Sequence, residues 1–329
     1  MIYIEKNDEL FKLHKKVLIE KICNEVDDKL LTKTSITIKK DTIQLDSTLI
    51  ELIEYFRDNI ENFIIGDIEK QKDLINEVQK KDKNLTRRYN QNDSKPNSYK
   101  LIRYIFETRG YDEFTKGFKY DTDKKYDAYT FVKLLDKKTC PYCNRNYISI
   151  IEKENENDKQ RRPELDHFHP KSIYPFLAVN YYNLIPSCST CNKLKSDDDS
   201  LKLLHPYDKQ TKDVNITYWL NDMKFYKVKS LKDIDFENEK FIDIEIENLP
   251  ENNKHTFQLE RLYQEHKDVV IELILKHLHY PQSYINELSK FGFGEEEIYR
   301  FVFSNYLNDL DKKPLAKLTK DIADELGLI

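Results

Sequence analysis

The chain has 329 residues, of which 39% are hydrophobic and 34% charged, so it can form one large domain or two ordinary ones beneath a heavily charged surface. No apolar stretch approaches the roughly 18 residues that a membrane span needs. Charged residues follow the N-terminus too closely for a secretory signal, so we expect a soluble, cytoplasmic protein that has no membrane partner. The net charge of −5 argues against a protein that binds nucleic acid through a strongly basic surface of its own.

Residues 1–128 are expected to form an N-terminal helical region. Leu49, Ile53 and Phe56 recur at helical spacing, and a second apolar stretch at 101–105 has the same period. This spacing gives each helix one apolar face that can pack on the others.

Residues 80–98, between these helices, are polar and include a proline near their end, which indicates a loop or an exposed segment. A charge run of this kind is ordinarily a solvated linker. The alternative is a strip that contacts DNA or RNA through Arg87, Arg88 and Tyr89, because residues 66–100 carry more Lys and Arg than Asp and Glu. Both interpretations remain open from the sequence.

Residues 129–210 form the next region, which is irregular and rich in Cys, His, Asn and Pro. Residues 211–248 are expected to be a β-rich extension. Its three predicted strands are 214–220, 225–228 and 241–246. The last of these reads FIDIEI and alternates apolar with acidic residues, the period of a half-buried strand.

Residues 249–329 are expected to form a C-terminal helical region. Acidic residues outnumber basic ones from position 221 to the end, which suits a protein partner or solvent better than a phosphate backbone. The single tryptophan, Trp219, is expected to lie in the core and not to stack on a ligand.

Four of the five cysteines form two pairs with one spacing, Cys140 with Cys143 and Cys188 with Cys191. Each pair can present two thiolates, and two pairs complete a tetrahedral zinc site. A disulfide interpretation needs an oxidising compartment, which nothing in the sequence indicates, and an iron–sulfur site is a further alternative. Four thiolates leave no open coordination position, so we expect this Zn²⁺ to be structural.

The sequence reads ELDHFHPKS between the cysteine pairs, and NLIPSCSTCNKLK across the second pair. Three motifs occur there in order, namely Asp166-His167, Asn183-Leu184, and Cys191-Asn192 followed by Lys195. This order resembles the DH…NL…CNxxK pattern of HNH endonucleases, from Cys140 to about Tyr207. The resemblance implies an α+β protein: a ββα-metal (HNH) finger with a structural zinc, embedded in a mainly helical protein with a small antiparallel sheet.

The resemblance also implies a role for each motif residue. His167 is the general base that takes a proton from water, for which imidazole has nearly the right basicity. Asp166 and Asn192 are oxygen ligands of a catalytic Mg²⁺ or Mn²⁺. Asn183 ties the intervening loop by hydrogen bonds and orients His167.

Four neighbouring residues have alternative interpretations. His169, two positions beyond His167, is a candidate third metal ligand or phosphate contact, or else a structural histidine. Glu164 has the same spacing from Asp166, but we interpret it as an ordinary strand residue. Lys195 and Lys193 are candidate contacts for the scissile or an adjacent phosphate, or else solvated residues of a helix face.

The wider pattern is similar to HNH nucleases of bacterial anti-phage defence systems, of the Septu type and of related retron-linked modules. That resemblance implies cleavage of nucleic acid, with DNA favoured and RNA open, alongside a partner such as an ABC-like ATPase. The chain contains no GxxxxGK(S/T) motif, so any nucleotide control has to come from another chain. The alternatives are a restriction-type endonuclease that acts alone and a non-catalytic, zinc-stabilised module that binds nucleic acid or serves as a scaffold.

Overall fold

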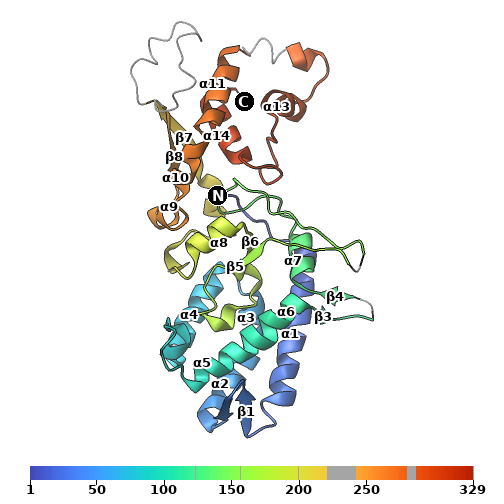
Figure 1. The fold of residues 1–329 in the computed structure, drawn as a ribbon, viewed down its shortest axis with the longest axis vertical. Coiled ribbons are helices and arrows are strands. Elements are labelled where there is room, and N and C mark those ends of the chain that lie inside the picture. Colours follow the sequence, from blue (N-terminus) through green and yellow to red (C-terminus); the bar gives the residue numbers. More distant parts are fainter. Residues whose placement is uncertain (123, 156, 199, 221–241, 280–286, 329) are drawn as a thin grey trace. The chain divides into compact units, whose positions relative to one another are not determined.

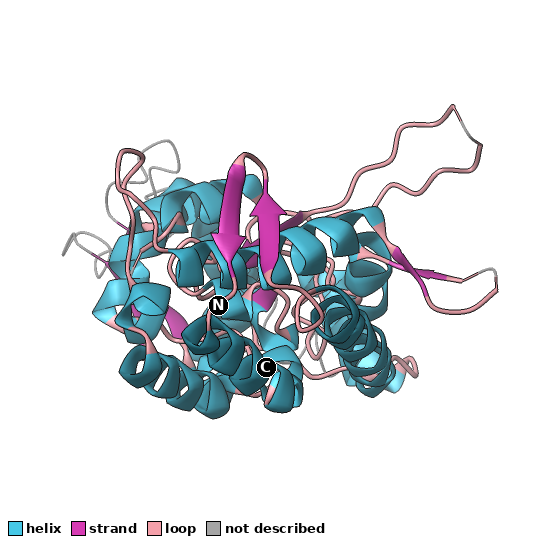
Figure 2. Cartoon of the chain, turned by 90° about the horizontal axis from the view of Figure 1, so that it is seen from below, coloured by secondary structure: helices cyan, strands magenta, loops and turns pink. Residues whose placement is uncertain are grey.

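The computed structural model describes residues 1–122, 124–155, 157–198, 200–220, 242–279 and 287–328. Helices make up most of the described chain, and the strands form short antiparallel pairs, as Figures 1 and 2 show. The predicted α+β class is therefore confirmed. Within the described residues, no helix is both long and apolar enough to cross a membrane.

The chain divides into two compact units that do not follow the order of the sequence. One comprises residues 4–136 and 149–207, and the other comprises residues 1–3, 137–148 and 208–329. This division differs from the four successive regions expected from the sequence.

The reason is that residues 137–148 pack with the C-terminal part of the chain. The backbone N–H of Thr139 donates to Asp311, and the N–H of Leu315 donates to the carbonyl of Asn144. The hydroxyl of Tyr263 donates to the carbonyl of Cys143 over 2.6 Å.

The first unit begins with the expected helical region. Its elements are α1 (Asp8–Lys29), β1 (Ser35–Ile38), β2 (Asp41–Gln44), α2 (Ser47–Asp58), α3 (Ile60–Ile65), α4 (Ile68–Lys81), η1 (Lys83–Thr86), α5 (Asn97–Arg103), the π-helix η2 (Tyr104–Asp112), α6 (Glu113–Lys116), β3 (Phe118–Lys119), β4 (Lys125–Tyr126) and α7 (Ala128–Leu135). Side-chain caps start several of them: Asn7 accepts from Leu10 at α1, and Asp46 accepts from Leu49 at α2.

The same unit continues through the segment that contains the motifs. Its elements are β5 (Glu164–His167), η3 (Pro175–Leu177), η4 (Tyr181–Asn183), β6 (Leu184–Ser187), α8 (Ser189–Lys195) and η5 (Ser200–Lys202). Strands β5 and β6 are antiparallel, with Asp166 opposite Ile185. Helix α8 follows β6 directly and contacts β5 (Figure 1).

The N-terminal helices hold the loop between β5 and β6 in place. Phe176 of this loop packs against Phe56 and Phe63, with ring centroids 6.0 and 5.8 Å apart. The buried imidazole of His14 hydrogen-bonds the carbonyl of Val179 over 2.8 Å. The helical region is therefore part of the core on which the motif segment folds, and not a separate attachment.

The second unit contains the expected hairpin and C-terminal helices. Its elements are η6 (Lys209–Asp213), β7 (Asn215–Leu220), β8 (Ile242–Glu247), α9 (Glu251–Phe257), α10 (Leu259–Tyr263), η10 (Gln264–His266), α11 (Lys267–His279), α13 (Glu295–Phe303) and α14 (Ala316–Glu325). Strands β7 and β8 pair in antiparallel register, and the apolar residues of the FIDIEI segment from Ile242 to Ile246 are buried. The strand predicted at 225–228 lies outside the described residues.

The prediction for Trp219 is wrong. Its side chain is 57% exposed, and its indole N–H donates to Glu245 on the neighbouring strand over 2.7 Å. A hairpin buries one face of each strand, and the alternation of β7 places Trp219 on the other face, where the indole N–H finds a carboxylate.

Candidate functional site

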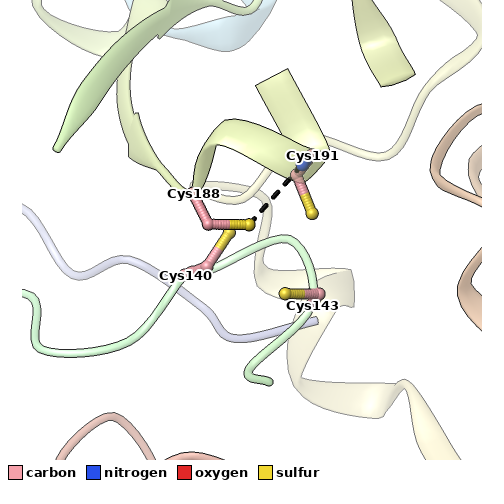
Figure 3. Close-up of side chains that lie close together, drawn as sticks. All are labelled: Cys140, Cys143, Cys188 and Cys191. Carbon is pink, nitrogen blue, oxygen red and sulfur yellow. Dashed lines mark hydrogen bonds between the residues drawn. The ribbon is translucent and has the colours of Figure 1, made fainter. Parts of the chain in front are cut away.

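The four paired cysteines lie together. Their sulfur atoms are all within 4.8 Å of one another, and Figure 3 shows the four side chains converging on one point. Tetrahedral zinc with bonds of about 2.3 Å requires sulfurs roughly 3.8 Å apart, so a small inward adjustment would complete the site. The four cysteines can therefore hold a metal ion such as zinc.

Local backbone geometry prepares both pairs for this role. Cys188 is the N-cap of α8, and its sulfur accepts the N–H of Cys191 over 3.5 Å (Figure 3). The sulfur of Cys143 accepts the N–H of Arg145 over 3.4 Å. Asn144 lies between them at a φ of 50°, a left-handed conformation that asparagine tolerates better than most residues. Such N–H donors stabilise thiolate charge around a metal.

The polar face of β5 meets the polar face of α8. Glu164 and Asp166 are two residues apart on the strand, and Asn192 and Lys195 are three apart on the helix, so each pair shares a face. The ammonium of Lys195 is 3.1 Å from Asp166 Oδ1 and 2.8 Å from the carbonyl of His167. Asn192 Nδ2 donates to Glu164 Oε2 over 2.6 Å. The amide oxygen of Asn192 is then the ligand atom that this residue can offer a cation.

His167 is the last residue of β5 and is fixed in one tautomer. Its Nε2 is 2.9 Å from the carbonyl of Ala178, and because a carbonyl only accepts, this nitrogen must carry the proton. Desolvation lowers the pKa of His167 to about 3, with a further lowering by the charge of Lys171. The imidazole is therefore neutral at neutral pH and Nδ1 has an available lone pair, although burial makes this ring a weaker base than free imidazole.

Asn183 holds the loop that follows His167. Its Oδ1 accepts the N–H of His169 over 2.6 Å, and its Nδ2 donates to the carbonyls of His169 and Leu177. The side chain is fully buried, so these bonds form away from competing water. Asn183 thus fixes both ends of the turn that carries Ala178, the partner of His167.

His169 does not join Asp166 and Asn192 in the structure. Its Nδ1 is 2.8 Å from the hydroxyl of Ser200, and burial lowers its pKa to about 3. Among the described residues, the cysteine cluster is the one group of three or more Cys, His, Asp or Glu side chains close enough to share an ion. The interpretation of His169 as a structural histidine agrees with these contacts.

The basic residues predicted to meet phosphate differ in their surroundings. Lys195 is completely buried, so it does not lie on a solvated helix face, and its contact with a phosphate stays a prediction. Lys193, Arg87 and Arg88 are exposed. Arg88 is bonded to the backbone carbonyl of Asp197 and lies 3.4 Å from its carboxylate, so the 80–98 segment packs beside the end of α8 and is not a free linker.

The structure adds one residue that the sequence did not suggest. Tyr111, on the π-helix η2, packs edge-on against His167 with ring centroids 4.4 Å apart. No local pattern announces this contact, because Tyr111 and His167 are 56 positions apart (167 − 111) and meet only through the tertiary fold.

Comparison with known proteins gives one partial match. A segment of 79 residues is 34% identical to the Septu protein PtuB of Bacillus thuringiensis. The match covers 24% of this chain and 27% of that protein, so it spans about a quarter of each. No protein-family model matches the chain, and no solved structure matches it.

Proposed function

We propose that this protein is a metal-dependent nuclease of the HNH type that hydrolyses phosphodiester bonds, with DNA as the favoured substrate. The observation that carries the proposal is the β5–β6–α8 arrangement. It holds a neutral His167 with an available Nδ1 at the end of a strand whose preceding residue is a carboxylate. Because His167 is the last residue of β5, the phosphodiester would lie across the end of this strand.

The catalytic divalent ion would be held by the carboxylate of Asp166 and the amide oxygen of Asn192. These hard oxygen donors suit Mg²⁺ or Mn²⁺. When bound, the ion supplies Lewis-acid stabilisation of the charge that develops on the phosphate oxygens. The ammonium of Lys195 lies 3.1 Å from Asp166 Oδ1, so this carboxylate already has one cationic neighbour.

The roles of His167 and Asn183 follow from their hydrogen bonds. Nδ1 of His167 takes the proton from the attacking water, and the bond from Nε2 to Ala178 prevents the ring from turning away. Asn183 is a positioning residue, because it fixes the loop that carries Ala178 and touches no reacting group. The zinc, with four thiolates, would stabilise the fold and take no part in the chemistry.

A role in bacterial anti-phage defence is supported by the partial similarity to a Septu protein. We propose that the chain acts as the effector of such a system together with an ABC-like ATPase. The net charge of −5 supports the dependence on a partner, because a nuclease acting alone gains affinity from a basic surface. A restriction-type enzyme that acts alone is the competing form of the same activity.

An assay with purified protein tests the proposal. Plasmid DNA and total RNA are incubated separately with zinc-loaded protein and Mg²⁺ or Mn²⁺, and EDTA is added to matched samples. We expect cleavage that requires the divalent ion and is lost in His167→Ala. Equal cleavage by His167→Ala would reject His167 as the base. Nucleic-acid binding without cleavage, with the candidate ATPase present, would favour the zinc-stabilised binding or scaffold module.

A further inference from the structure

Besides Ala178, the imidazole of His167 contacts Tyr111, and cationic side chains lie around that tyrosine. The ring of Tyr111 contacts His167, and the ammonium of Lys171 lies 4.6 Å from the centroid of the Tyr111 ring. Lys171 follows His167 by four residues, on the loop that Asn183 holds. Tyr111 therefore contacts both Lys171 and the proposed base, His167.

Arg162 lies at the other end of the same tyrosine. Burial raises the pKa of Tyr111, and the guanidinium of Arg162, adjacent to the hydroxyl, lowers it. Arg162 also donates to the carbonyl of Pro163 over 2.9 Å and lies 5.9 Å from the ring of Tyr129. Among the described residues, none of these contacts of Arg162 is with a carboxylate. A guanidinium held by neutral groups keeps its full charge for an anion.

Lys171 is only partly neutralised. Its ammonium is 3.3 Å from Glu107, but the same carboxylate also receives a double contact from Arg103. The carboxylate of Asp112 also lies near Tyr111 and Arg103. Asp166, which is paired with Lys195, is a third carboxylate near Tyr111. Arg162, Lys171, Arg103 and Lys195 are thus four cations against the three carboxylates Glu107, Asp112 and Asp166, an excess of one positive charge (4 − 3).

Lys195 is buried against Asp166, whereas a phosphate contact is easiest for a cation that reaches the surface. Lys171 is 31% exposed in its side chain, and Arg162 is partly exposed. If the scissile phosphate lies beside His167, a phosphate next to it on the Tyr111 side would meet one of these two cations. Arginine and lysine are the residues that bind such oxygens most often.

We propose that Lys171 and Arg162, arranged around Tyr111, form a phosphate-binding subsite that grips the sugar–phosphate backbone of nucleic acid beside His167. This proposal rests on the proposed nuclease function and adds to it the residues that recognise the backbone. Helix η2 supplies Tyr111 and Glu107, so the N-terminal helical region forms one wall of the subsite. Contacts of this kind are independent of base sequence and depend on salt.

Binding measurements test the subsite without cleavage. Fluorescently labelled DNA duplex, single-stranded DNA and RNA are titrated with full-length, zinc-loaded protein in buffer without Mg²⁺ or Mn²⁺, at several salt concentrations. The variants are Lys171→Gln and Arg162→Gln. The matched controls are Lys15→Gln and Arg57→Gln, which alter exposed, ion-paired residues on α1 and α2 of the same unit. Thermal unfolding of each variant verifies its fold.

Each subsite variant should weaken binding severalfold and reduce the slope of log K against log salt by about 1 for duplex DNA. The controls should change neither quantity. The substrate whose affinity falls most identifies the backbone, DNA or RNA, that the subsite serves. Unchanged affinity and slope in folded Lys171→Gln and Arg162→Gln, while the wild type binds, would overturn the subsite alone. A wild type that binds none of the three probes would overturn both the subsite and the nuclease proposal.

Discussion

Lys195 shows how one buried side chain can organise the end of a strand. Its ammonium bonds the carboxylate of Asp166 and the backbone carbonyl of His167, and its side chain has no exposed surface. Lys195 therefore pairs with the Asp166 carboxylate and fixes the backbone from which His167 projects.

Replacing this lysine should cost stability. Lys195→Met keeps the volume but removes the buried ammonium that pairs with the buried Asp166 carboxylate, so we expect a loss of about 3–5 kcal/mol in the free energy of unfolding. Lys193→Met, on the exposed face of the same helix, should change it by less than about 0.5 kcal/mol. Denaturant unfolding of both variants provides the measurement.

A double variant separates the ion pair from simple packing. Asp166→Asn combined with Lys195→Met removes both charges, and its loss should be smaller than that of Lys195→Met alone. Equal losses in Lys195→Met and Lys193→Met would show that the buried pair contributes nothing.

Buried histidines predict the response of stability to acid. Burial lowers the pKa of His14 to about 4, whereas an unfolded histidine titrates near 6.5. Between these values the unfolded chain binds a proton that the folded chain does not, so stability falls as pH drops from about 6.5 toward 4. In His14→Gln, the free energy of unfolding should depend less steeply on pH in this range, by the amount that the uptake of about one proton contributes. An unchanged slope in a series of melting curves from pH 7 to pH 4 would contradict the burial of neutral His14.

The sequence could predict the motif residues because they are close together or regularly spaced. The order of Asp166, Asn183 and Asn192, the first two between the cysteine pairs and the third directly after Cys191, was readable without a fold. The burial of Lys195 was not readable, because a lysine three positions after Asn192 on a helix is usually solvated. The contact of Tyr111 with His167 depends on tertiary packing and leaves no local pattern.

At the level of elements, the cysteine pairs are the feature on which the short β5–β6–α8 segment depends most. Two strands of four residues and one helix of seven bury little apolar surface. A metal held by Cys188 at the start of α8 adds binding free energy that the segment lacks. The hydrogen bond from Cys191 to Cys188 already sets the sulfur in place.

Metal analysis should find about one zinc per chain, which resists mild chelation. Cys188→Ser should lower the zinc content and the melting temperature together, because the tetrahedral site loses a thiolate. Cys23→Ser is the matched control, since Cys23 lies on α1 and is not part of the cluster. Iron in place of zinc, or zinc content that is unaffected by Cys188→Ser, would contradict the account of this site.

In the hairpin β7–β8, the alternation of apolar and polar residues predicts the buried positions of β8 but was not applied to Trp219 of β7. Ile242, Ile244 and Ile246 are buried as their spacing indicated. The same alternation leaves Trp219 on the outer face of β7, although a lone tryptophan is more often buried. The residue type suggested that Trp219 lies in the core, but the register of the β7–β8 pair places it on the exposed face.

At the scale of the whole molecule, contacts do not follow chain order. Residues 137–148 were expected to belong with the motif segment, because they carry the first cysteine pair. Instead, Asn144 bonds the carbonyl of Leu310 and accepts the N–H of Lys317. Such pairings, more than 160 positions apart in sequence, come from side-chain complementarity that periodicity does not encode.

The overall charge leads to a prediction about dependence on a partner. We expect the purified chain to cleave nucleic acid slowly and a partner ATPase to raise its rate, because the chain has a net charge of −5. The comparison is the initial rate with and without the candidate ATPase, at low and physiological salt. Full activity of the chain alone, with no stimulation, would favour the restriction-type enzyme.

The central claim is that phosphodiester cleavage depends on His167. Its most direct test is the cleavage rate under single-turnover conditions with Mn²⁺, compared between the wild type and His167→Ala at equal zinc content and equal melting temperature. The account predicts a loss of about 10²–10⁴-fold, as for removal of a general base, with partial recovery when free imidazole is added. A His167→Ala variant that cleaves at the wild-type rate would contradict it.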